Sequence, residues 1–98
     1  MKRIQTKSGF VCNVNEARVG DWRFAKGLAR CESDDDSEKI KGLTFVVPFL
    51  LGDDGEAALV EHVKQKDGII QTAKILAEFR EILTLLGEES KKSKSSQE

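Results

Sequence analysis

The sequence has few of the residues that form disulfides, metal centres or long apolar spans. Its 98 residues include two cysteines, one histidine and one proline. Cys12 and Cys31 lie far apart in a chain that opens Met-Lys-Arg and has no apolar leader, so we expect free thiols in a reducing cytoplasm. The longest apolar run, from Leu43 to Leu51, is far too short to cross a bilayer, and no membrane partner is expected.

The sequence also lacks an excess of charge of either sign. Its 16 Lys and Arg residues are matched by 17 Asp and Glu residues, which leaves a net charge of −1 and no overall attraction to phosphate backbones. A composition that is 39% hydrophobic and 34% charged is typical of a folded globular chain. We therefore expect one hydrophobic core and no nucleic-acid partner.

No spacing of residues points to catalysis or to a bound cofactor. Cys12, Cys31 and His62 have neither C-x-x-C nor H-x-x-x-H spacing, so no zinc site is expected. A calcium loop counted from Asp34 fails because Lys39 stands where glycine is needed. No glycine-rich phosphate loop and no motif that activates a cysteine is present. We expect a protein that is not an enzyme and takes no metal or cofactor.

Alternating residues at the N-terminus predict a β-hairpin. The turn is Lys7-Ser8-Gly9, whose glycine is free to adopt a positive φ. The alternating positions are Ile4 and Thr6 before the turn and Phe10, Cys12 and Val14 after it. The last three residues should share one face of their strand, and that face must be covered by helices because an isolated hairpin is only marginally stable.

Helical periodicity predicts four helices, over about residues 22–31, 37–51, 53–66 and 72–87. The first is capped by Asp21, and its core-facing stripe is Trp22, Ala25, Leu28 and Ala29. The second has the stripe Ile40, Leu43, Val47, Leu50 and Leu51, and Pro48 should kink or interrupt it. The third has a narrow face of Leu59, Val60 and Val63. The fourth has the clearest pattern, formed by Ile75, Leu76, Phe79, Ile82, Leu83 and Leu86, and should end at Gly87.

These elements predict an α+β fold that is mainly α, with an N-terminal β-hairpin packed on a bundle of about four helices. Residues 1–87 should form the single folded domain. Residues 88–98 contain no apolar side chain and should form a flexible charged tail.

Two surfaces are candidates for binding. The first is aromatic: Phe45, Val46 and Phe49 lie away from the expected apolar stripe of their helix, so they either pack in the core or under loops, or form a partner or self-association surface. The second is basic and aromatic, and consists of Arg18, Trp22, Arg23, Phe24, Lys26 and Arg30. Such a face could stack on nucleic acid, but Trp22 falls on the apolar stripe and an acidic segment follows, so we expect an ordinary helix surface.

The order of these signals carries a family resemblance. Its parts are the Lys7-Ser8-Gly9-Phe10 turn, the Asp21-Trp22 step, a helix ending Leu50-Leu51-Gly52, the run Glu61-His62-Val63 before Asp67-Gly68, and a final amphipathic helix with a charged tail. In this pattern, over about residues 3 to 92, the chain resembles the small tail assembly chaperones of long-tailed bacteriophages and prophages of Gram-positive hosts. Pro48 departs from the leucine-rich helix of that family.

The resemblance implies a viral protein that binds the tape measure protein in the bacterial host cytoplasm. It would promote assembly of the tail tube from the major tail protein and would be absent from the mature particle. It also implies a longer product made by ribosomal frameshifting, and Ser90-Lys91-Lys92 is compatible with a slippery codon string. The alternative is a small helical regulatory protein that binds nucleic acid or a toxin-like partner.

Overall fold

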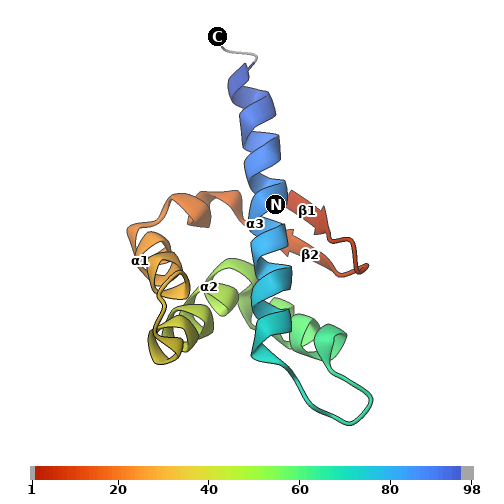
Figure 1. Cartoon of the computed structure of the whole chain (residues 1–98). Coiled ribbons are helices and arrows are strands. Elements are labelled where there is room, and N and C mark those ends of the chain that lie inside the picture. Colours follow the sequence, from red (N-terminus) through yellow and green to blue (C-terminus); the bar gives the residue numbers. More distant parts are fainter. Residues whose placement is uncertain (1, 96–98) are drawn as a thin grey trace.

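The computed structural model describes the backbone of residues 2–95 and the side chains of residues 2–87. The chain forms two strands, β1 (Lys2–Gln5) and β2 (Val11–Val14), a short 3-10 helix, η1 (Glu16–Gly20), and the helices α1 (Trp22–Cys31), α2 (Asp36–Val63) and α3 (Thr72–Ser95). The fold is α+β and mainly α, as the sequence predicts (Figure 1).

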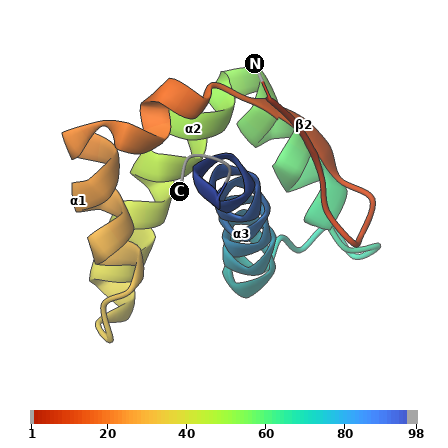
Figure 2. The same ribbon diagram turned by 90° about the horizontal axis from the view of Figure 1, so that it is seen from above.

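The N-terminal hairpin is antiparallel, with Ile4 opposite Cys12. Its turn depends on Gly9, whose φ of 94° is costly for any residue with a Cβ. The predicted inner face is confirmed, because Phe10, Cys12 and Val14 are all buried. The hairpin packs beside α2 and α3, which cover this face (Figure 2).

Helix α1 has the predicted start and end but presents a different face to the core. The Asp21 side chain accepts a hydrogen bond from the backbone N–H of Arg23 at 2.8 Å and so caps the helix. Trp22 is 74% exposed, and Ala25 and Ala29 are exposed too, so the predicted stripe is wrong except for the partly buried Leu28. The residues that are buried are Phe24, Gly27 and Cys31.

The reason is the close packing of α1 against α2. A Cβ on Gly27 would lie 2.6 Å from Cγ1 of Val46, so only glycine fits between the two helices. Glycine has no apolar side chain and does not count in a hydrophobic stripe, yet Gly27 fixes which face of α1 is turned inward. Trp22 lies two residues before Phe24, which is about 200° around a helix, and it therefore points outward.

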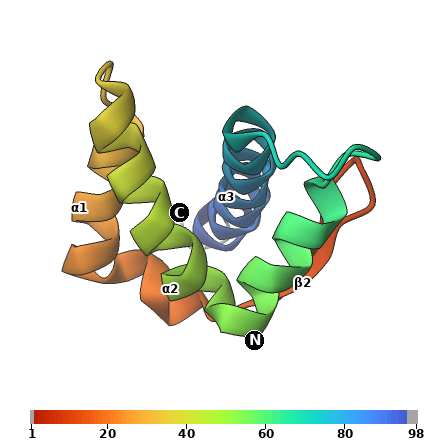
Figure 3. The same cartoon turned by 90° about the horizontal axis from the view of Figure 1, so that it is seen from below.

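Helix α2 is two helices joined at a sharp break. Gly52 has φ 79° and ψ 167°, which divides α2 into residues 36–51 and 53–63, the division that the sequence predicts. The predicted interruption at Pro48 is wrong, because the backbone keeps helical dihedral angles there. Pro48 removes only one backbone hydrogen-bond donor, and the helix continues through it. The change of direction occurs at Gly52, the one residue of α2 with non-helical dihedral angles. The two halves diverge as a V (Figure 3).

Helix α3 confirms the predicted stripe but is longer than predicted. Phe79, Ile82 and Leu86 are buried, and Ile75, Leu76 and Leu83 pack against the core. The helix continues through the predicted stop at Gly87 to Ser95, because a helical glycine costs only about 1 kcal/mol and the Glu and Lys residues that follow favour a helix. The last three residues of the predicted tail, 96–98, lie outside the described residues.

The N-terminal part of α3 lies between the two halves of α2, and the core forms where these helices meet (Figure 3). The largest side chains with almost no exposure are Phe24, Phe79, Leu59 and Ile82. Among residues 2–95, no helix is both long enough and apolar enough to cross a bilayer.

Candidate functional site

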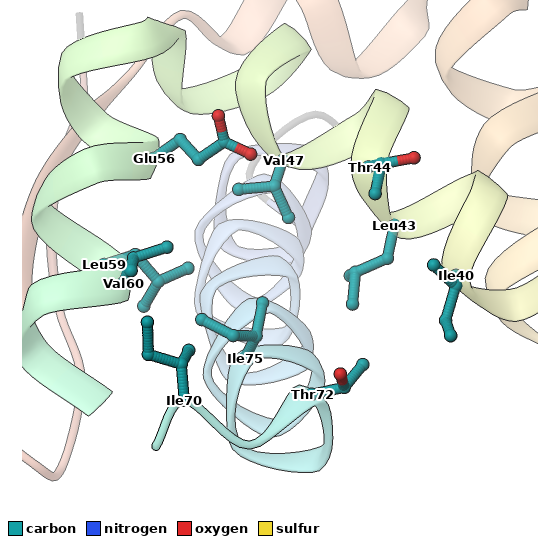
Figure 4. Close-up of a pocket in the computed structure, with 10 residues that line it drawn as sticks. All are labelled: Ile40, Leu43, Thr44, Val47, Glu56, Leu59, Val60, Ile70, Thr72 and Ile75. Atoms are coloured by element: carbon teal, nitrogen blue, oxygen red, sulfur yellow. The ribbon is translucent and has the colours of Figure 1, made fainter. Parts of the chain in front are cut away.

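The V of α2 holds an apolar groove with a volume of about 170 Å³, which we call the isoleucine groove. It is lined by Ile40, Leu43, Thr44, Val47, Glu56, Leu59, Val60, Ile70, Thr72 and Ile75. Figure 4 shows these side chains converging from both halves of α2, from the loop before α3 and from the first turn of α3. The groove therefore depends on the break at Gly52, which sets its two walls apart.

The rim of the isoleucine groove exposes large apolar side chains. Ile40 is 48% exposed and Ile70 is 41% exposed, and Ile69 beside it is 55% exposed. The sequence places Ile40 on the core stripe, and this prediction is wrong because Ile40 lies near the open end of the V, on the rim of the groove. Neighbouring half-exposed isoleucines are costly in water, and such apolar patches commonly mark interfaces.

The loop that carries Ile70 is ordered by its own hydrogen bonds. The backbone N–H of Gln65 donates to the carbonyl of Ile69 at 2.9 Å, and that of Gly68 donates to the carbonyl of Gln65 at 2.9 Å. Gly68 has a φ of 86°, and the side chain of Asp67 accepts from the N–H of Ile69 at 3.0 Å. These bonds hold the two isoleucines in place, so little conformational entropy remains to be lost when a partner binds.

Sequence reasoning missed this groove. Ile69 and Ile70 follow Asp67-Gly68 in a short turn without periodicity, so no helix or strand pattern marks them. Two adjacent isoleucines in an otherwise polar turn were the available signal.

The predicted aromatic surface lies on the other side of the first half of α2. Val46 is fully buried, with 0% exposure, so it packs in the core, which is one of the alternatives that the sequence leaves open, and it is not exposed as a binding residue. Phe45 is 40% exposed and Phe49 is partly buried, and their rings stack with centroids 5.2 Å apart. Of the three predicted binding residues, only Phe45 and Phe49 therefore reach the surface.

Phe49 is surrounded by the basic residues of the second predicted surface. The guanidinium carbons of Arg18 and Arg23 lie 5.2 and 5.3 Å from the centre of its ring. Nη1 of Arg18 also donates to the carbonyl of Phe49 at 2.8 Å. That carbonyl lies in the last turn before Gly52, where helix carbonyls lack intrahelical partners. Arg18 thus caps the first half of α2, while Phe24 of the same predicted surface belongs to the core.

His62 belongs to a polar cluster that joins the hairpin turn to the helices. Its Nε2 lies 2.9 Å from Oγ of Ser8, and the Ser8 hydroxyl donates to Oε1 of Glu78 at 2.8 Å. Thr6 also donates to Glu78, at 2.8 Å. Because Ser8 gives its one hydroxyl proton to Glu78, His62 must donate to Ser8 rather than take its proton. These hydrogen bonds tie the hairpin turn to α2 and α3. They do not activate Ser8 as a nucleophile, because the histidine does not accept the hydroxyl proton.

The two cysteines are free, as predicted, and both are buried. Burial raises the pKa of the Cys12 thiol, and burial together with the nearby Glu32 carboxylate raises that of Cys31. Both thiols therefore stay protonated at neutral pH, which disfavours reaction. Within the part of the chain that the structure describes, no three His, Cys, Asp or Glu side chains gather in a way that could hold a metal ion.

Comparison with known proteins assigns no relative to this fold: no protein-family model, no curated protein and no solved structure matches the chain.

Proposed function

We propose that this protein is a tail assembly chaperone that binds an amphipathic helix of a tape measure protein in the isoleucine groove. The observation that supports this function most directly is the groove itself, an apolar hollow between two helices whose rim exposes Ile40 and Ile70. A helix with apolar residues at steps of three and four can lay that face into such a groove.

The one carboxylate in the groove favours a partner helix that carries positive charge. Glu56 is the one charged residue that lines it, and it has no ion-pair partner among the described side chains. A lysine or arginine next to the apolar stripe of the partner could pair with this carboxylate at the edge of the contact. We therefore expect the bound segments to be amphipathic and basic at the border of their apolar face.

The role as an assembly chaperone rests on the family resemblance together with this groove. Many copies could occupy successive apolar stripes of one long tape measure protein and prevent its aggregation in the host cytoplasm. Each contact is small, so the copies can be displaced as the major tail protein polymerises. The chaperone would then be absent from the mature particle.

A pair of matched variants tests the groove. Ile70→Asp places a charge on its rim, and Val11→Asp places the same charge on the outer face of the hairpin, where Val11 is 40% exposed. Burying one isoleucine contributes about 1.5–3 kcal/mol. We expect Ile70→Asp to weaken binding at least about tenfold, and Val11→Asp to bind as the parent does.

The measurement is co-purification and titration with fragments of the tape measure protein from the same phage or prophage. Circular dichroism of both variants shows whether they remain folded. Equal binding by the parent and a folded Ile70→Asp variant would exclude the groove. Binding to duplex DNA that weakens steeply with salt, without binding to any tape measure fragment, would instead favour the regulatory protein.

A further inference from the structure

A second hollow lies between α1 and the first half of α2, and we call it the cationic hollow. It has a volume of about 210 Å³ and is lined by Arg23, Lys26, Gly27, Arg30, Gly42 and Phe45. Its two glycines lie where the helices approach most closely, since a Cβ on Gly42 would lie 2.7 Å from Cβ of Arg30. Three cationic side chains and one half-exposed aromatic ring thus surround a small hollow, which exists because the two glycines have no side chains to fill it.

Two of the three cations are available to a ligand. Lys26 and Arg30 are exposed and have no ion-pair partner among the described side chains. Arg23 is already held by Asp21, through bonds of 3.1 Å from Nε and 2.9 Å from Nη2. Trp22 lies one turn before Lys26 on the same side of α1 and is 74% exposed. The site therefore combines unpaired positive charge with apolar surface.

We propose that the cationic hollow binds an acidic segment of a partner protein, with carboxylates on Lys26 and Arg30 and a neighbouring apolar side chain against Phe45. This site goes beyond the tape measure groove. Gly42 and Phe45 lie on the side of α2 opposite to Leu43 and Val47, given about 100° per residue. Both sites can therefore be occupied at once, and the protein can hold two chains together.

The length of the charged strip favours a protein segment over nucleic acid. From Trp22 to Arg30 the helix rises about 12 Å at 1.5 Å per residue. That length matches about four residues of an extended peptide. Single-stranded nucleic acid occupies about 4–16 nucleotides in its binding grooves, and a strand continued past Arg30 would approach Asp34, Asp35 and Asp36.

The test uses synthetic peptides and the fluorescence of Trp22, the only tryptophan in the chain. The probes are the peptide GEEFEEG, the charge-reversed peptide GKKFKKG and a short oligothymidylate. The variant is the double substitution Lys26→Gln and Arg30→Gln. Its control is Lys66→Gln with Lys74→Gln, which removes the same charge from two exposed lysines outside both the cationic hollow and the isoleucine groove.

We expect GEEFEEG to change the Trp22 fluorescence and to bind the parent and the control alike. Exposed ion pairs each contribute modestly, so the loss of two should make the double variant bind roughly tenfold more weakly. No binding of GEEFEEG, equal loss in the control, or tighter binding of GKKFKKG or oligothymidylate would overturn the proposal. These outcomes are independent of the tape measure groove, because Lys26 and Arg30 do not line it.

Discussion

At the scale of single residues, two glycines set the distance between α1 and the first half of α2. A Cβ on Gly27 would meet Val46, and one on Gly42 would meet the backbone N of Cys31 at 2.8 Å. Overpacking of this kind cannot be relieved by a rotamer change when the neighbouring atom is backbone. The contact between the helices therefore depends on the absence of side chains at these positions.

Two glycine substitutions with opposite expected signs test this contact. Gly42→Ala should lower the free energy of unfolding by about 1–3 kcal/mol, because the clash outweighs the better helix propensity of alanine. Gly87→Ala, where a Cβ meets nothing within 4 Å, should raise it by about 0.5–1 kcal/mol. Urea unfolding followed by circular dichroism measures both. A stabilised Gly42→Ala variant would show that the helices can separate without cost.

The same two glycines explain one limit of sequence prediction. A hydrophobic stripe counts apolar side chains, so it places Trp22 and Ala25 of α1 in the core and leaves out Gly27. In the structure Gly27 is buried and Trp22 is 74% exposed. The buried face of a helix that packs through glycine depends on the partner helix, and no single-helix pattern contains that information.

At the scale of elements, the caps and the breaks of the helices follow from local chemistry. Asp21 and Asp35 accept hydrogen bonds from backbone N–H groups at the starts of α1 and α2. The cap at Asp21 was predicted, and Asp35 lies in the acidic segment that follows α1. The break in α2 was also predictable, because Gly52 followed by two aspartates is a stop and a start signal. The end of α3 was not, since helix formers after Gly87 outweigh its local penalty.

The cap of α1 has a testable pH dependence. The hydrogen bond from the Arg23 side chain, with the backbone N–H bond, lowers the pKa of Asp21 from 3.8 to about 2. A lowered folded-state pKa contributes stability above pH 3.8 that is lost as the pH falls toward 2. The parent should therefore be more stable than Asp21→Asn at neutral pH, and this difference should shrink over that interval. Urea unfolding of both proteins at several pH values measures it, and a constant difference would contradict the assigned cause.

At the scale of the whole molecule, the fold was predicted better than the sites. The hairpin and the stripe of α3 follow from periods of two and 3.6 residues, whereas the start of α1 and the break in α2 follow from the local signals at Asp21 and Gly52. The isoleucine groove is made by parts distant in the sequence, with Ile40, Val60 and Ile70 brought together by the V of α2 (Figure 4). Because Val46 is buried, the predicted surface of Phe45, Val46 and Phe49 retains only its two phenylalanines.

The two hollows on opposite sides of the first half of α2 give the molecule two separate surfaces of different chemistry. One is apolar with a single carboxylate, and the other is cationic with an aromatic ring. The two surfaces share the first half of α2 but no lining residue, so substitutions that change binding at one surface should leave binding at the other intact.

The most direct test of the central claim, that the isoleucine groove binds a tape measure helix, is a titration followed through isoleucine methyl groups by NMR. Five of the six isoleucines fall into two groups: Ile40, Ile70 and Ile75 line the groove, whereas Ile4 and Ile82 are buried and do not line it. With overlapping peptides of the tape measure protein, at least one peptide should shift the methyl signals of Ile40, Ile70 and Ile75 and leave those of Ile4 and Ile82 nearly unchanged. Binding that leaves the three groove signals unmoved, or no binding by any peptide, would contradict the account.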